Sequence, residues 1–275
     1  MFETFQLKSG VTGLMGYHWE SENAKAVLCI IHGMGEYGGK YERMADEMVR
    51  NNIAVLAMDL RGHGCSVGKR GHIGRRADVL RDVDGIVSLA MRKYIDLPIV
   101  VYGHSLGGNI VLDYRHHGSL ATTPALYVAS SPWLVLNRKL SRVRSGVIRV
   151  MGRLKPDFPI RAHVNRLNDD RLAHDNISAL TIKEGTTAAK NLLSGDPYWN
   201  VNGRKPLIIM QGTADRVCNP EGPRKIAEIE GSGCKLVEWR GFGHELHGVD
   251  GLTDGTKVIK RLAELIEEEL GGGLR

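Results

Sequence analysis

One short stretch constrains the fold of this chain more than any other, because it joins a buried strand to a helix through a turn with a serine at its centre. Residues 99–102 form an apolar, β-branched run, as in a strand that is buried on both faces. Helical spacing of apolar residues resumes over residues 109–114. Between the two runs stands Gly103-His-Ser-Leu-Gly107, which fits the pattern G-x-S-x-G. The stretch therefore predicts a strand-turn-helix unit with Ser105 at the turn.

The predicted turn also suits a nucleophile. Flanking glycines leave room for a turn so tight that Ser105 takes up strained dihedral angles and its Oγ stands above the sheet. The Leu106 N–H lies at the start of the next helix, where backbone donors are unpaired and negative charge is favoured. This amide can therefore hold an oxyanion. A bare G-x-S-x-G is common by chance, so it is the strand-turn-helix context that makes Ser105 a candidate nucleophile.

The rest of the chain alternates strands and helices. With 275 residues, of which 42% are hydrophobic, it is long enough for one large domain and too short for two. Apolar runs predict strands at residues 4–8, 14–19, 26–31, 54–58, 125–130, 206–211 and 235–239, and helices at residues 44–49, 76–94, 220–229 and 255–270. This order predicts an α/β fold with a mostly parallel, doubly wound sheet.

The alternation stops between Trp133 and about Gly203. We therefore expect a core of residues 1–132 and 204–275 and an inserted helical cap of residues 133–203. The cap contains a second predicted helix at residues 175–193, and a first in which apolar residues recur at helical spacing, namely Leu140, Val143, Val147, Ile148, Met151 and Leu154. Because the insertion follows the strand after the serine turn, it should lie over the carboxyl ends of the strands as a lid.

Positive charge is concentrated in this predicted lid. The whole chain has a formal net charge of +6, and between Trp133 and Arg171 ten Lys or Arg stand against three acids. The basic segment is not interleaved with stacking aromatics, which argues against a nucleic-acid partner. Two interpretations stay open. The first lid helix packs its apolar side on the core with its charges in solvent, or it faces lipid and makes a peripheral membrane contact.

The remaining composition indicates a protein of the cytoplasm, which the basic lid could place at the periphery of a membrane. The first residues show no basic region followed by an apolar stretch, and no run approaches the ~18 apolar residues that a membrane span needs. The four cysteines form no C-x-x-C pair and no short even spacing. We therefore expect reduced thiols, without a disulfide framework or a zinc site.

A nucleophilic serine needs an imidazole and a carboxylate, and both are found downstream in the expected order. Asp215 follows the strand that ends at Gln211, and His244 follows the strand that ends at Trp239. His247 is the rival base. The other acids considered, Asp196, Asp250 and Asp254, follow no strand. The histidines of His244-Glu-Leu-His247 are three residues apart where H-E-x-x-H needs four, so we predict no metal there.

Two loops near this predicted site carry further candidates. The glycine-rich loop from His32 to Tyr41 lacks the endings of phosphate-binding loops, and the Met34 N–H is better interpreted as the second oxyanion donor. Asp59, Arg61 and His63 lie in a loop without a nucleophile of its own. We interpret that loop as a hydrogen-bonded structural element near the site.

Together these motifs resemble the monoacylglycerol lipase and lysophospholipase group of α/β-hydrolases. The motifs that carry the resemblance are His32-Gly-Met-Gly-Glu36 with Tyr41, Arg61-Gly-His-Gly64 with Ser66, Gly103-His-Ser-Leu-Gly-Gly108, Gly212-Thr-Ala-Asp215 and Gly243-His-Glu-Leu-His247. The resemblance implies an α/β-hydrolase fold with a lid, a triad of Ser105, Asp215 and His244, and an oxyanion hole from the Met34 and Leu106 amides. It also implies no cofactor. Gly33, His104 and Cys218 are candidate pocket residues, and for Cys218 a small buried apolar role is equally open.

The sequence therefore predicts a serine carboxylester hydrolase that acts on a small-molecule acyl ester, a monoacylated lipid such as a monoacylglycerol. A lysophospholipase, a thioesterase, or a general carboxylesterase or peptidase of the same fold is the alternative enzyme. A ligand receptor that keeps the site without catalysis is the alternative outside enzymes. Lid sequence sets the pocket, so acyl chain length and leaving group stay open, as does the oligomeric state.

Overall fold

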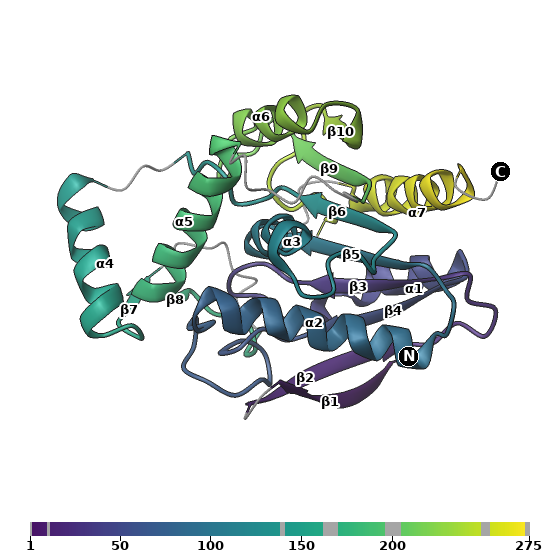
Figure 1. Cartoon of the computed structure of the whole chain (residues 1–275), viewed down its shortest axis with the longest axis horizontal. Helices are drawn as coiled ribbons and strands as arrows, with labels where there is room; N and C mark the ends of the chain where they lie inside the picture. Colours follow the sequence, from purple (N-terminus) through teal and green to yellow (C-terminus); the bar gives the residue numbers. More distant parts are fainter. Residues whose placement is uncertain are drawn as a thin grey trace.

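An eight-stranded sheet forms the centre of the molecule, in the order β1-β2-β4-β3-β5-β6-β9-β10 (Figure 1). The structure is a computed structural model and describes residues 2–9, 12–137, 141–161, 170–195, 205–248 and 254–272. The strands are β1 (Glu3–Ser9), β2 (Thr12–Trp19), β3 (Ala26–Ile31), β4 (Ile53–Met58), β5 (Ile99–His104), β6 (Leu126–Ser130), β9 (Leu207–Gly212) and β10 (Cys234–Trp239). β1 and β2 are antiparallel, β2 pairs with β4 antiparallel, and all other neighbours are parallel. The predicted mostly parallel sheet is confirmed.

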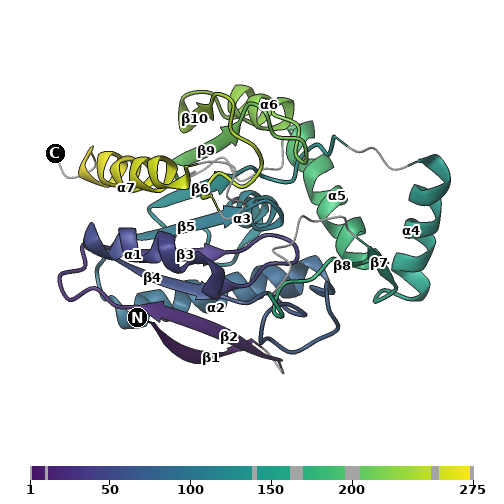
Figure 2. The same cartoon turned by 180° about the vertical axis from the view of Figure 1, so that it is seen from behind.

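Helices cover both faces of the sheet (Figures 1 and 2). One face carries α2 (Arg76–Lys93), α3 (Leu106–His117) and α6 (Glu221–Glu230), and the other carries α1 (Glu42–Arg50) and α7 (Gly255–Gly272). Two short 3-10 helices, η1 (Gly38–Tyr41) and η2 (Gly231–Gly233), precede α1 and β10. The strands and helices predicted for this core are all present, with differences of a few residues at their ends.

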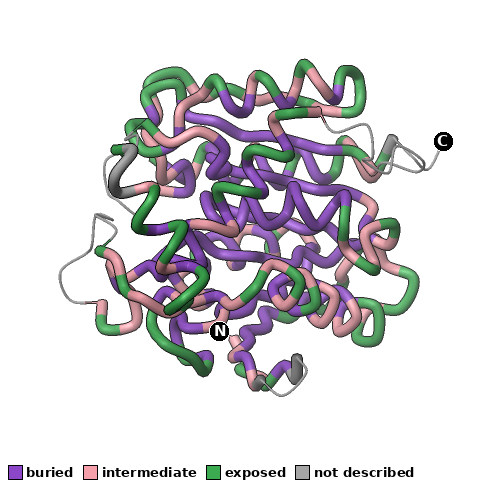
Figure 3. Tube along the Cα trace, turned by 60° about the vertical axis from the view of Figure 1, so that its left-hand side comes forward, coloured by how far each residue is buried: buried purple, intermediate pink, exposed green. Residues whose placement is uncertain are grey.

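Alternation of side chains along each strand explains why the strands read as continuous apolar runs. In β3, Val27, Cys29 and Ile31 enter the core under α2 and α3, whereas Leu28 and Ile30 enter the core under α1 and α7. Both sets are fully buried, so no position in the strand can be polar. Figure 3 shows the buried strands passing through the middle of the molecule, with the exposed residues toward its outside.

The segment between β6 and β9 holds the predicted lid helices as α4 (Arg142–Leu154) and α5 (Ala179–Ser194). It also contains a short antiparallel ribbon that the sequence analysis missed, β7 (Pro159–Arg161) with β8 (Asn176–Ser178). α5 packs against α3 and α6, and α4 packs on α5 and stands apart from the sheet (Figures 1 and 2). α4 therefore packs on one helix, whereas the helices of the core pack on the sheet.

The apolar residues of α4 are not buried as a single stripe. Ile148 is 5% exposed, whereas Val147 is 49% and Leu154 is 76% exposed. Met151 is half-buried, Leu140 lies outside the described residues, and the side chain of Val143 is not described. The interpretation in which this stripe packs on the core is therefore wrong for Val147 and Leu154. None of the described helices is both long enough and apolar enough to cross a bilayer.

Backbone hydrogen bonds join the base of the lid to two loops of the core. The His174 N–H donates to the Gly35 carbonyl at 3.0 Å, and the Ser178 N–H donates to the Gly71 carbonyl at 3.0 Å. Both glycines have a φ of +78°. A Cβ on Gly35 would lie 2.2 Å from the His174 carbonyl oxygen, and one on Gly71 would lie 2.0 Å from that of Asn176. Only glycine permits these contacts.

Candidate active site

Ser105 lies in the turn between β5 and α3, and its backbone is strained as predicted. Its φ is 53° and its ψ is −110°, which is rare for a residue with a side chain. A Cβ on Gly103 would lie 2.2 Å from the Gly107 carbonyl oxygen, and a Cβ on Gly107 would lie 2.0 Å from that of Ile31. Both glycines are therefore required by the close approach of other backbone, as predicted.

The structure brings the three residues of the predicted triad together from three separate loops. Nε2 of His244 lies 3.0 Å from Oγ of Ser105, and Nδ1 of His244 lies 2.8 Å from Oδ2 of Asp215. Asp215 follows β9, and His244 lies in the loop after β10. Since β9 and β10 run parallel to β5, with β6 between β5 and β9, the carboxyl ends of these strands meet at one edge of the sheet.

The Asp215 carboxylate is fully buried and accepts hydrogen bonds on both oxygens. Oδ1 accepts from the backbone N–H groups of Val217 at 2.8 Å and Cys218 at 2.9 Å. Oδ2 accepts from Nε2 of Gln211 at 3.1 Å and from His244. Burial opposes ionisation, but the hydrogen bonds from His244 and the two amides outweigh it and lower the pKa of Asp215. The carboxylate is therefore ionised near neutral pH.

An ionised Asp215 determines where the protons lie. Because the carboxylate can only accept, Nδ1 of His244 must carry a proton and donate it to Oδ2. Nε2 of the neutral ring then has a free lone pair directed at Ser105 Oγ, 3.0 Å away. The arrangement can remove the hydroxyl proton of Ser105 and stabilise the imidazolium that results.

The orientation of the Met34 amide follows from the protonation of His32. The Leu60 N–H donates to Nε2 of His32 at 2.9 Å, so the ring proton is on Nδ1, which donates to the Gly33 carbonyl at 2.7 Å. Burial lowers the pKa of His32 and favours this neutral ring. In a trans peptide the N–H of Met34 points opposite to the Gly33 carbonyl. Among the described residues, neither Met34 nor Leu106 donates its amide proton to a protein acceptor, so both amides are free.

The Glu36 carboxylate holds the loop of Gly33 and Met34 through a hydrogen bond, a role that was not predicted from the sequence. Its carboxylate accepts from the Gly33 N–H at 2.8 Å, from the Tyr41 hydroxyl at 2.8 Å and from Nζ of Lys40 at 3.2 Å. Burial opposes its ionisation, but the positive charges of His104 and Lys40 help to lower its pKa. The sequence signal for this role is an acid three residues after Gly33 in a glycine-rich loop.

The candidate pocket residues differ in where they lie. Gly33 adjoins the nucleophile, since a Cβ on it would lie 3.3 Å from Cβ of Ser105. Cys218 is fully buried, with Sγ within 4.8 Å of donor atoms of Asp215 and His244, and burial raises the pKa of its thiol well above the usual range. His104 is 1% exposed, and its ring lies 5.0 Å from the ring of His244. His104 is thus a buried neighbour of His244.

Neither of the two rival residues that the structure describes, His247 and Asp254, takes the predicted place of the base or the acid. His247 is buried and stacks on Tyr41, with ring centroids 4.9 Å apart. Asp254 is exposed and lies 3.8 Å from Arg43. The other two rival acids, Asp196 and Asp250, lie outside the described residues.

The loop of Asp59, Arg61 and His63 is structural, as predicted. Asp59 accepts from the backbone N–H groups of Gly38 at 2.6 Å and Cys65 at 2.7 Å. Arg61 makes a two-pronged contact with Asp82, at 2.6 and 2.7 Å. These bonds fix the two loops beside the site. In the part of the chain that the structure describes, the side chain bonded to Ser105 Oγ is that of His244, which comes from another loop.

Two groups of possible metal-ligating side chains occur in the described part of the chain. One is Asp215, Cys218 and His244, which is the predicted triad with its neighbouring thiol. The other is His104, Glu245 and His247. In each group the donor atoms lie within 4.8 Å of one another.

Comparisons with known proteins find one family model and several relatives. Residues 22–250 match the sequence model of the family described as Hydrolase_4, serine aminopeptidase S33. A monoacylglycerol lipase of Mycolicibacterium smegmatis is 27% identical over 237 residues, which cover 81% of this chain and 82% of that protein. An uncharacterized abhydrolase domain-containing protein of Dictyostelium discoideum is 29% identical over 241 residues, 81% of this chain, and this chain spans 24% of that relative's length.

Among solved structures, a soluble variant of monoglyceride lipase from Saccharomyces cerevisiae, in complex with a substrate analog, superimposes with a TM-score of 0.85. The two are 20% identical, and the match covers 98% of this chain and 95% of that one. The fold is therefore shared over nearly the whole length of both chains.

Proposed function

The chain belongs to the Hydrolase_4 family (serine aminopeptidase, S33) and is a hydrolase with the α/β-hydrolase fold, and from this premise we propose that it cleaves a monoacylated lipid ester such as a monoacylglycerol. One observation carries the proposal. Ser105, His244 and Asp215 form a chain of contacts of 3.0 and 2.8 Å at the end of the sheet. The named lipases among the relatives support the choice of ester.

The proposed mechanism has two steps that use the same residues. Ser105 Oγ attacks the ester carbonyl while its proton passes to Nε2 of His244, and the oxyanion is held by the N–H groups of Met34 and Leu106. Collapse expels the alcohol, which takes the proton from His244 and leaves an acyl group on Ser105. Water then attacks the acyl-enzyme in the same way and releases the fatty acid. Asp215 stabilises the imidazolium in both steps.

Labelling and rate measurements test this proposal. A fluorophosphonate should form one adduct, located on Ser105 by mass spectrometry, and a p-nitrophenyl ester should give a burst of product. Ser105→Ala should abolish both. A protein that binds the ester without burst or adduct would be a receptor, and the proposal would be wrong.

A substrate panel tests the leaving group. Monoacylglycerols of several chain lengths are compared with lysophospholipids, acyl thioesters and aminoacyl anilides at equal concentration. We expect the highest kcat/KM for a monoacylglycerol. A preference of tenfold or more for another class would replace the proposed substrate by that class.

We further propose that α4 contacts the surface of a membrane. Three of its apolar residues, Val147, Val150 and Leu154, are 49%, 49% and 76% exposed. Arg149 and Arg153, on the same helix, are exposed as well. Each basic residue near an anionic surface contributes ~1 kcal/mol, and each buried Val or Leu side chain contributes up to about 1.5–3 kcal/mol. The helix thus combines the two contributions that an interfacial helix needs.

Vesicle binding tests this contact. Reversal of both charges, Arg149→Glu with Arg153→Glu, removes ~2 kcal/mol of attraction and should weaken binding to anionic phospholipid vesicles by at least about 30-fold. Arg92→Glu with Lys93→Glu, exposed at the C-terminal end of α2, is the control with an equal change of charge. Hydrolysis of a soluble short-chain ester should be unchanged in both. Equal loss of binding in the control would mean that α4 is not the contact.

A further inference from the structure

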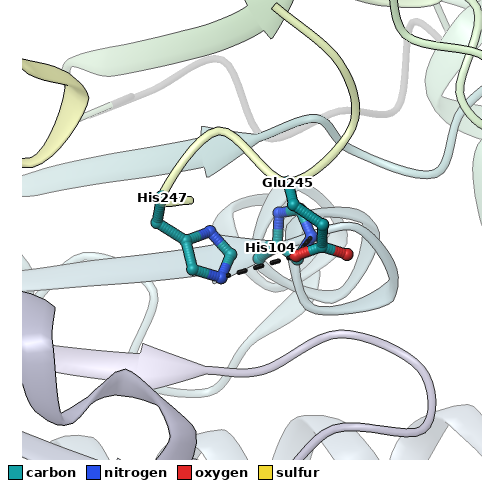
Figure 4. Close-up of side chains that lie close together, drawn as sticks. All are labelled: His104, Glu245 and His247. Carbon is teal, nitrogen blue, oxygen red and sulfur yellow. Dashed lines mark ion pairs between the residues drawn. The ribbon is translucent and has the colours of Figure 1, made fainter. Parts of the chain in front are cut away.

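Three side chains next to the candidate active site, two buried histidines and a partly exposed glutamate, have no part in the proposed mechanism. His104 ends β5, and Glu245 and His247 lie in the loop after β10 (Figure 4). Oε2 of Glu245 lies 3.4 Å from Nε2 of His104 and 3.6 Å from Nε2 of His247. The two histidines are 1% and 4% exposed. One carboxylate oxygen therefore faces both imidazole rings inside the protein.

Apart from these contacts with Glu245, the two imidazoles lack hydrogen-bond partners in the described part of the chain. None of their four ring nitrogens makes a hydrogen bond of normal geometry within the described part of the chain. Buried polar atoms without partners are rare in native proteins, and each instance calls for an explanation such as a bound ion. The four ring nitrogens therefore lack the partners that buried polar atoms usually have.

The distances fit a tetrahedral metal ion. Zinc bonds to His nitrogen and carboxylate oxygen measure about 2.0–2.2 Å, so neighbouring ligands at the corners of a tetrahedron are about 3.3–3.6 Å apart. The two distances from Glu245 Oε2, 3.4 and 3.6 Å, lie in this range. Two histidines and one carboxylate, with water as the fourth ligand, are a ligand set that zinc uses in proteins. We propose that His104, Glu245 and His247 bind one divalent transition-metal ion.

Neighbouring residues hold these ligands in place. His247 stacks on Tyr41 with an angle of 23° between the rings, and the Tyr41 hydroxyl donates to Glu36 at 2.8 Å. His104 is held in β5 by pairing with β6. A ring that is already oriented loses little freedom when it binds an ion.

A small cavity adjoins one of the three proposed ligands, His247. It measures about 160 Å³ and is lined by His247 together with residues of η1, α1 and α7. Its two basic lining residues are paired with acids. Lys40 lies 3.2 Å from Glu36, and Arg43 lies 3.8 Å from Asp254. The positive charges of these two residues are therefore balanced by acids, which reduces their repulsion of a cation that enters the cavity.

The negative charges around the site favour a cation there. His104 faces Glu245, Glu36 and Asp215, and these charges outweigh burial and raise its pKa. His247 faces the same two glutamates together with His104 and Lys40, and burial lowers its pKa to about 4. Both imidazoles must be unprotonated when they bind a metal ion.

An ion at this site would act on the proposed catalysis through His244. The ring of His104 lies 5.0 Å from the ring of His244. A positive ion nearby disfavours the imidazolium that His244 must become when it takes the proton of Ser105. We therefore expect the ion to inhibit hydrolysis reversibly. This effect rests on the proposed function, whereas binding of the ion does not.

Metal titration of the protein without a polyhistidine tag tests the site. After treatment with a chelator and buffer exchange, Co²⁺ is added at pH 8 and its visible spectrum is recorded, and Zn²⁺ is titrated by calorimetry. We expect one ion per chain and tetrahedral Co²⁺ bands. Glu245→Gln and His247→Gln should each weaken Kd by at least about 100-fold, since even outer-shell partners of a metal are worth about 10- to 100-fold. His117→Gln, on a half-exposed histidine, is the matched control and should bind as the wild type.

Further variants separate this site from the predicted triad, whose Asp215, Cys218 and His244 are the rival ligand group. Cys218→Ser should keep both the spectrum and the inhibition by Zn²⁺, and the protein blocked at Ser105 should still bind one Co²⁺. Loss of binding in Cys218→Ser with retention in Glu245→Gln and His247→Gln would overturn the proposal. So would the absence of any bound ion at 1:1 in the folded wild type. If no ester is hydrolysed, the proposed function is wrong, but the Co²⁺ spectrum still tests the metal site. Failure of the proposed function is therefore distinguishable from failure of the metal site.

Discussion

Replacing Asp215 by asparagine tests the proton arrangement of the site directly. Oδ1 of Asp215 accepts from two backbone N–H groups, those of Val217 and Cys218. An asparagine NH2 group cannot accept, so the new side chain must keep its oxygen at this position. Its NH2 group then takes the place of Oδ2, 2.8 Å from Nδ1 of His244.

The consequence is a change of tautomer. Facing a donor, Nδ1 of His244 must accept, so the ring proton moves to Nε2, which lies 3.0 Å from Oγ of Ser105. A protonated Nε2 cannot take the hydroxyl proton. A wrong tautomer of this kind costs about 10⁴-fold in kcat in a serine protease, which corresponds to about 5 kcal/mol in the barrier. We expect a loss of the same order here.

Folding should survive the change. Beyond His244, the asparagine NH2 group meets the amide of Gln211, so one hydrogen bond of ~1 kcal/mol is lost. For a chain of this size the expected fall in Tm is ~2–4 °C. Hydrolysis of a p-nitrophenyl ester and thermal unfolding by circular dichroism measure both effects.

Asp254→Asn makes the same substitution on an exposed carboxylate and should leave both kcat and Tm unchanged. If Asp215→Asn retains more than a tenth of the wild-type kcat, Asp215 does not control the tautomer of His244, and the argument fails.

The remaining predictions concern the nucleophile and its base, a buried thiol and a buried histidine. Ser105→Ala and His244→Ala should each lower kcat by at least ~10³-fold, because nucleophile and base act as a unit; a turnover rate that survives in His244→Ala and disappears in His247→Ala would make His247 the base. The Cys218 thiol should resist a bulky thiol reagent in the folded protein and react rapidly in urea, because it is buried and its pKa is raised; rapid labelling of the native protein at Cys218, followed by mass spectrometry, would show an open pocket there. Burial lowers the pKa of His174 to about 4, so below pH ~6.5 the unfolded chain binds a proton that the folded chain does not, and stability should fall as pH drops from 7 to 5; urea midpoints should show a smaller fall in His174→Asn, and an equal fall would exclude His174 as a cause.

Sequence reasoning reached the core of this fold because each buried strand reports its own environment. Residues 26–31 are apolar at every position, and the structure buries all six. The strand-turn-helix unit around Ser105 is equally local, and the loops that carry Asp215 and His244 follow strands in chain order. Short or partnerless elements could not be recognised in this way. β7 and β8 have three residues each, too few for a pattern, and the spacing of apolar residues in α4 predicts a helix without saying whether anything covers it.

The second cluster of side chains was hidden for a different reason. A local motif search compares His244 with His247, which are neighbours in sequence, and their spacing excludes a helical zinc motif. The structure instead places His247 beside His104, more than a hundred residues earlier in the chain, with Glu245 between them. Contacts of this kind depend on strand order, which the sequence does not display. Glu36 escaped for the same reason, since its partners become apparent only when the loop is folded.

The joint between the lid and the core limits how this protein can be re-engineered. Exchange of lids between relatives is an obvious way to change substrate preference. Here, however, the lid rests on Gly35, two residues after Gly33 in the loop that offers the Met34 amide, and on Gly71. A transplanted lid that does not present a backbone N–H and carbonyl at these two glycines would leave them unsupported and free to move. Chimeras should therefore exchange the segment from the start of α4 to the end of α5. Within this segment they should retain His174, Asn176 and Ser178 of the host.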